Sequence, residues 1–184
     1  MGISLVWLAA QGIDAEEFLE RLAFEDTGEI DPYFEHDHSG GALPGGWYVI
    51  LSGDMGLIET GKLAKWSAGA RLVAVAVHEE TQTSLASEWR EGRLAWSASH
   101  DGAEGGDRLD VEGELPALFE ELRREAEALA AEAGSASEDG AFSLAFSLPL
   151  DLAADITGFR HDEIGFDDDI GPFTVLERLF SAGE

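Results

Sequence analysis

The pattern of apolar and polar positions divides the chain into short strands and longer helical stretches. Continuous or weakly alternating apolar runs predict strands, because strand side chains point alternately to the two faces of a sheet. Apolar residues repeated at helical spacing predict amphipathic helices. The predicted strands are 3–9, 47–53 and 71–78, and the predicted helices are 13–24, 57–70 and 114–134.

The segment 83–99, TSLASEWREGRLAWSAS, predicts a β-hairpin that turns at residues 91–92. A two-residue turn gives a register that pairs Trp96 with Ser87. In this register one face of the hairpin is apolar and buried, and the other is charged and solvent-exposed. The residues expected on the buried face are Leu85, Trp89, Leu94 and Trp96, and those expected in solvent are Glu88 and Arg90.

The remaining segments complete a predicted α+β domain over 1–184. Segment 25–46 reads as a long acidic loop, 109–113 as a short strand, 142–148 as a last strand and 149–156 as a helix. The order β-α-β-α-β-β-β-α-β-α favours a mixed, largely antiparallel sheet with a central Trp-rich hairpin and helices on one side. The linker 134–140 is the best candidate for a minor boundary.

Composition supports a folded protein and excludes several kinds of chemistry. With 184 residues, 45% of them hydrophobic and five of them tryptophan, the chain can bury a core. It has no cysteine, which excludes disulfides, thiolate nucleophiles and cysteine-ligated metal centres. The apolar start lacks a basic region and is too short to span a bilayer, so we expect a buried first strand in a cytoplasmic protein.

Charge is the strongest compositional feature. The chain has 38 acidic and 11 basic residues, for a net charge near −27. Such a charge repels nucleic-acid phosphates and anionic membranes, so we expect neither as a partner. It favours high solubility and steers basic partners toward the protein.

The sequence FEHDHSGG, residues 34–41, carries the best candidate metal ligands. His36 and His38 would point the same way on an extended segment, and imidazole is a common metal ligand. His161, followed by Asp162 and Glu163, is the candidate third ligand. The alternative, which we favour, is a mobile or surface loop whose histidines interact with nearby carboxylates and hold no tightly bound metal.

Two further clusters are weaker. The acidic run 167–169 is a candidate for a hard cation but lacks the spacing of an EF-hand, so a solvated charge run is preferred. His78 and His100 each end a predicted strand and would meet at one sheet edge if both faced Thr83. Ordinary strand-end histidines are the simpler interpretation. No serine lies in a G-x-S-x-G elbow, and no glycine-rich loop matches a phosphate-binding pattern.

The segments ISLVWLA, LPGGWYVIL and SEWREGRLAW, in the first 100 positions, resemble those of uncharacterised bacterial cytoplasmic proteins, including acidic proteins of the immunity or antitoxin kind. The resemblance implies no activity and no catalytic residues. Charge, aromatic content and the lack of a catalytic signature favour a non-enzymatic binder of a basic protein, without cofactor. The alternatives are a metal-dependent hydrolase that uses His36, His38 and His161, and a structural or homo-oligomeric acidic protein.

Overall fold

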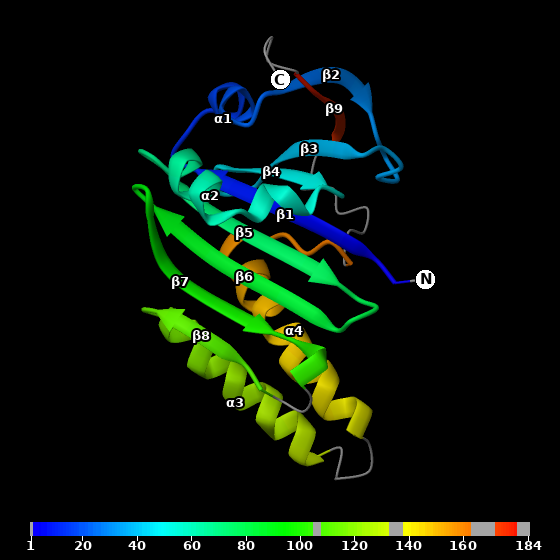
Figure 1. Ribbon diagram of the computed structural model, residues 1–184, viewed down its shortest axis with the longest axis vertical. Helices are drawn as coiled ribbons and strands as arrows, with labels where there is room; N and C mark the ends of the chain where they lie inside the picture. The colour runs from blue at the N-terminus through cyan, green and yellow to red at the C-terminus, as the bar shows by residue number, and fades with distance from the viewer. Residues whose placement is uncertain (1, 105–107, 133–137, 163–171, 180–184) are drawn as a thin grey trace.

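The computed structural model describes residues 2–104, 108–132, 138–162 and 172–179, and these build one nine-stranded antiparallel sheet with helices on it (Figure 1). This architecture confirms the predicted α+β class. The strand order across the sheet is β2-β9-β3-β4-β1-β5-β6-β7-β8. The strands are β1 (Ser4–Gln11), β2 (Phe24–Ile30), β3 (His38–Leu43), β4 (Trp47–Ser52), β5 (Arg71–His78), β6 (Thr83–Arg90), β7 (Arg93–His100), β8 (Asp110–Gly113) and β9 (Thr174–Arg178). The helices are α1 (Ala15–Arg21), α2 (Thr60–Trp66), α3 (Ala117–Glu132) and α4 (Glu138–Thr157), with the short 3-10 turns η1 (Met55–Ile58) and η2 (Gly102–Glu104).

The central strands β4, β1 and β5 are buried on both faces. All six residues of β4 are buried, as the continuous apolar run predicts. Apolar side chains on both faces of a strand require cover on both sides of the sheet. Helices therefore have to pack on the two opposite faces.

Two separate cores flank the sheet. The first core lies between the sheet and helices α3 and α4, and the second lies between the sheet and α1, η1 and α2 (Figure 1). The prediction that the helices pack on one side is therefore wrong. Representative members of the first core are Trp7, Val75, Trp96, Phe119 and Leu152, and of the second core Val6, Phe18, Ile50, Leu63 and Trp66.

The β6–β7 hairpin contains a register shift that the sequence analysis missed. Trp89 pairs with Leu94, but Trp96 pairs with Glu88 instead of Ser87, which leaves Ala95 as an extra residue. One extra residue reverses the faces of everything beyond it. Trp89 accordingly lies in the second core and Trp96 in the first, so the prediction that they share a face is wrong.

Glu88, which pairs with Val73 and Trp96 of the first core, is buried. Its carboxylate is inaccessible to solvent and contacts two arginines, with Arg71 Nη2 at 2.6 Å from Oε1 and Arg90 Nη2 at 2.6 Å from Oε2. Arg71 also lies over the ring of Trp47, 5.1 Å from its centroid. Arg90 is exposed as predicted, whereas the prediction that Glu88 faces solvent is wrong.

The segment 25–46, predicted as a loop, contains β2 and β3. Strand β9, from the far end of the chain, lies between them and pairs with both. Two glycines on β3 permit this arrangement, because a Cβ on Gly41 would lie 2.4 Å from the ring of Phe173, next to β9. The strands form through tertiary pairing, which the local polar sequence does not reveal.

The segment 142–148, predicted as a strand, belongs to helix α4, and the proline predicted to start a helix, Pro149, lies inside it. Near that proline Ser84 Oγ on β6 donates a hydrogen bond of 2.7 Å to the carbonyl of Phe146.

The predicted boundary at 134–140 falls partly at the start of α4 and partly outside the described residues. In the part of the chain that the structure describes, no helix is both long and apolar enough to cross a membrane.

Candidate binding cleft

A cleft of about 440 Å³ opens where β1 and β3 begin and β4 ends. The segment before β3 and the residue His161, beyond the end of α4, complete its walls. Its apolar part extends from the first core, and its polar part comes from two histidines, an aspartate and three serines. The lining residues that matter below are Leu5, Tyr33, Phe34, His36, Asp37, Ser39, Leu51 and His161.

Asp31 orders the segment that forms one wall of the cleft. Its carboxylate is 2% exposed and accepts hydrogen bonds from Ser39 Oγ at 2.5 Å, Glu35 N at 3.1 Å and His36 N at 3.3 Å. Burial alone would raise the pKa of Asp31, but these hydrogen bonds, led by the one from Ser39, lower it below its usual range. A charged, fully bonded carboxylate therefore fixes the loop.

The same carboxylate orients His36. His36 Nδ1 lies 3.2 Å from Asp31 Oδ2, while nearly half of the His36 side chain remains exposed. An aspartate on one ring nitrogen orients the imidazole and leaves the other nitrogen for a ligand or a proton. The Ser39 hydroxyl donates its hydrogen bond to the same oxygen of Asp31 that His36 contacts. Ser39, His36 and Asp31 therefore do not form a catalytic triad, in which the serine would contact the histidine.

His161 is the unsatisfied polar group of the cleft. Both ring nitrogens are shut off from water and have no hydrogen-bond partner among the described residues. Burial lowers the pKa of His161 and outweighs the opposite effect of Asp162. The imidazole is therefore neutral near pH 7, with one nitrogen able to donate and the other able to accept a hydrogen bond.

His38 lies away from this cleft. Its ring packs against Phe24 of the second core, with centroids 4.8 Å apart, and its Nδ1 is 2.7 Å from Ser52 Oγ. Burial and the nearby Arg178 lower the pKa of His38. The ring therefore stays neutral and serves the packing between β2, β3 and β4.

The three predicted metal ligands are thus divided. His36 and His161 line one cleft although 125 positions separate them in the numbering, and His38 lies on the other face of the sheet. Among the described residues, no three histidine, aspartate or glutamate side chains are grouped as metal ligands. Glu163 and the acidic run 167–169 lie outside the described residues. The FEHDHSGG segment is an exposed loop only through residue 37, because His38 begins β3.

The strand-end histidines do not form the predicted pair. His78 pairs with Thr83 as predicted, but the hairpin shift places His100 opposite Ser84. His100 is buried, and its Nδ1 lies 2.8 Å from the carbonyl oxygen of Arg108. The simpler interpretation of strand-end histidines fits this arrangement.

Sequence reasoning missed the residues that organise the cleft. Asp31 precedes a proline in the sequence IDPYF, a pattern typical of turns, and its hydrogen bonds to Ser39 and Glu35 are local. That signal was available. The approach of His161 was not, because only the packing of α4 against the sheet brings it to residues 31–39.

Comparison of the chain with protein-family models, curated proteins and solved structures gives no match. The function must therefore be inferred from the arrangement of the residues alone.

Proposed function

We propose that this chain is a non-enzymatic acidic protein that binds a basic protein partner through the exposed side of β2. We call this surface the acidic edge. It consists of β2, which is the edge strand at the opposite end of the sheet from β8, together with the segment that follows β2 (Figure 1). Its residues are Glu25, Asp26, Glu29, Ile30 and Tyr33, all exposed.

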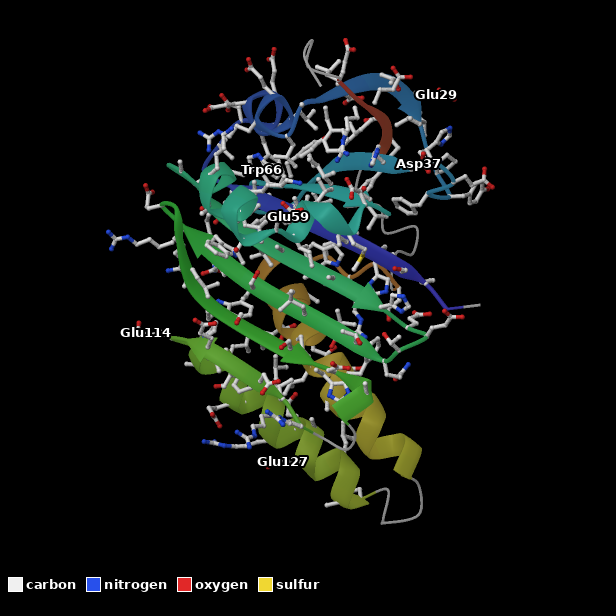
Figure 2. All side chains as sticks on the ribbon, in the orientation of Figure 1. Glu29, Asp37, Glu59, Trp66, Glu114 and Glu127 are labelled. Atoms are coloured by element: carbon white, nitrogen blue, oxygen red, sulfur yellow. The ribbon has the colours of Figure 1, made fainter. Side chains whose placement is uncertain are left out.

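The acidic excess is not neutralised within the protein. Eight of the 11 lysines and arginines already form ion pairs with carboxylates of the described residues. The many remaining carboxylates keep a strong negative field at the surface, which accelerates association with basic partners. Figure 2 shows two of them, Glu29 and Asp37, on the same side of the upper part of the molecule.

One observation carries the proposal. Glu25 on β2 lies directly opposite Glu177 on β9, and both residues are exposed. Neither carboxylate contacts a cation within the described residues. Like charges directly opposite each other destabilise a strand pair. A feature that costs stability is expected where a partner supplies the missing positive charge.

The acidic edge also carries apolar contact area. Ile30 is 57% exposed and Tyr33 is 70% exposed. Aromatic and apolar anchors supply binding energy at the centre of interfaces, whereas surrounding charges set the association rate and the choice of partner. The combination of both on one strand edge supports a protein partner over a free cation.

The same proposal includes a cytoplasmic setting, no nucleic-acid or membrane partner and no cofactor, and it leaves homo-oligomerisation open. A cysteine-free chain suits a reducing compartment. The acidic field opposes phosphate-bearing partners.

The test uses charge reversal at the acidic edge. A synthetic peptide of alternating arginine and alanine serves as the basic probe, and its affinity is measured by calorimetry in about 0.15 M salt. The Glu25→Lys, Glu29→Lys double variant is expected to bind the peptide at least about tenfold more weakly than the parent.

The matched control is Glu121→Lys with Glu125→Lys, two exposed positions on α3 that change the net charge by the same amount. This control is expected to bind nearly as well as the parent. Equal losses in both variants would mean that the peptide senses only net charge, and the proposal would be wrong. No loss at the acidic edge would mean that its carboxylates only keep sheet edges of different molecules apart.

A further inference from the structure

The cleft and the acidic edge form one continuous surface. Tyr33 lines the cleft and is also exposed at the end of the acidic edge, three positions after Ile30. A partner seated on β2 therefore meets the mouth of the cleft. The inference below rests on the proposed function and specifies which group of the partner enters this cavity.

Carboxylates surround the cleft. Asp37 lines it, and Glu35 is exposed beside it in the same loop. Glu79, whose Oε2 accepts a hydrogen bond of 3.0 Å from the backbone N–H of Ile3, lies close enough to His161 to raise its pKa. These charges favour a cationic occupant and disfavour an anionic one.

The nearest arginine does not cancel this field. The Arg160 guanidinium already forms ion pairs with Asp151 and with Asp162, the latter at 2.7 Å from Nε. Its charge is therefore shared with two carboxylates. The cleft retains a net negative character at its polar end.

The lining suits a flat cation with several hydrogen-bond donors. Tyr33 and Phe34 supply aromatic faces and edges, and Leu5 and Leu51 an apolar floor. Guanidinium groups stack on aromatic rings and are less strongly hydrated than ammonium groups. The volume of about 440 Å³ lies within the range of small-ligand pockets.

His161 lacks the partner that such a group would bring. An unpaired buried polar atom costs stability, and once the His161 ring turns its accepting nitrogen toward the cleft, a guanidinium N–H supplies the missing donor. His36, oriented by Asp31, and the carboxylate of Asp37 provide further acceptors on the opposite wall. The polar groups of the cleft can therefore accept hydrogen bonds from the N–H groups of a bound cation.

We propose that the cleft receives an arginine side chain of the basic partner, with its guanidinium between Asp37 and His161 and its stem against Leu5, Phe34 and Leu51. The side chain enters past Tyr33. Lysine fits less well, because its ammonium neither stacks nor spans two acceptor walls.

The experiment titrates the isotopically labelled full chain with N-acetyl-arginine amide and follows backbone and imidazole resonances. The neutral isostere N-acetyl-citrulline amide and the corresponding lysine amide are the comparison ligands. We expect saturable shifts at residues 33–37 and at His161 with the arginine compound. The citrulline compound is expected to bind at least about tenfold more weakly. Equal binding of both, or shifts spread over the acidic surface without a focus at the cleft, would overturn the proposal.

Two variants locate the site. Asp37→Asn and His161→Gln are each expected to weaken binding of the arginine amide by about fivefold or more. The control is Glu35→Gln, which removes the same charge as Asp37→Asn from an exposed position that does not line the cleft. If His161→Gln disturbs the fold, the exposed Asp37 variant decides. Equal weakening by Asp37→Asn and Glu35→Gln would reject a specific pocket.

Failure of this inference is distinguishable from failure of the proposed function. One outcome is that the peptide binds more weakly only to the acidic-edge variant and the arginine amide does not bind at the cleft. The proposed binding function is then supported, and the assignment of the cleft as an arginine pocket is wrong. If the peptide binds all variants alike and the amide shows no focus, both fall.

Discussion

At the scale of single residues, Glu88 is a charge buried inside the molecule, because both faces of the sheet are covered. Its two oxygens contact Arg71 and Arg90, and both arginines reach solvent with their outer atoms. Breaking a buried ion pair by removing one partner is strongly destabilising, but the cost falls when the remaining charge can be hydrated. The pair therefore orients β5 and β6 more than it adds to stability.

We expect Glu88→Gln to lower the free energy of unfolding by about 1–3 kcal/mol, because the amide loses the attraction of both guanidiniums. Urea denaturation measures the change. Arg90→Gln is the control, since the Arg90 side chain is 57% exposed, and its cost should stay below about 1 kcal/mol. If Arg90→Gln lowers the free energy of unfolding more than Glu88→Gln does, the carboxylate of Glu88 is not the main stabilising member of this ion-pair cluster.

His161 gives a residue-scale prediction for pH. Burial first, partly offset by Asp162, holds its folded-state pKa below about 6.5, the usual value in the unfolded chain. As the pH falls below about 6.5 the unfolded imidazole takes up a proton before the folded one. The unfolded state is thereby favoured, so His161 contributes stability above this pH that is lost as the pH falls toward the folded-state pKa.

The measurement compares the parent with His161→Gln in urea at about pH 7.5 and about pH 5.0. The parent is expected to lose more stability on acidification than the variant does. Asp31 does not interfere, because its lowered pKa acts only below about 3.8. An identical pH dependence in both proteins would contradict the assignment of a lowered pKa to His161.

At the scale of elements, the approach of β9 to β3 depends on the absence of side chains. A Cβ on Gly41 would lie 2.4 Å from Phe173, whose ring packs in the first core between Phe34 and Phe159. We expect Gly41→Ala to destabilise the protein by about 1–3 kcal/mol through overpacking, measured by urea denaturation.

Gly53 is the matched control for this substitution, since a Cβ there meets nothing within 4 Å and its backbone φ is not positive. Gly53→Ala is expected to be neutral within about 0.5 kcal/mol. Similar losses at both positions would mean that strand propensity and not the contact with Phe173 dominates.

At the scale of the whole molecule, the negative charge far exceeds the number of cations available to pair with it. Self-repulsion destabilises a compact, highly charged state, and salt screens it. We expect the urea midpoint to rise as sodium chloride is increased from about 0.05 M to about 0.5 M. The Glu25→Lys variant should show a smaller rise, because it removes the repulsion with Glu177. A flat or falling midpoint in the parent would show that the charges are dispersed well enough to matter little.

The sequence by itself determined the elements whose pattern is local. The apolar runs of β1, β4 and β5 and the amphipathic α1 and α3 follow from hydrophobic periodicity, which burial has to satisfy in any fold of this chain. The acidic character and the absence of thiol chemistry follow from composition alone. His36, His38 and His161 were singled out because imidazole and the neighbouring carboxylates are common metal ligands.

Only the tertiary structure decided the features that depend on partners distant in sequence. β2 is a polar, glycine-bearing segment that becomes a strand because it pairs with β9, and the free edge of β3, which already pairs with the neighbouring β4, accepts β9 on its other side. Residues 142–148 alternate like a strand, yet they are helical because the sheet already presents a complete face on which α4 packs. One extra residue at Ala95 placed Trp96 on the face opposite Trp89, beside Glu88. The same long-range packing brought His161 to the loop ordered by Asp31 and left His38 on the other side, because strand alternation separates side chains that are neighbours in sequence.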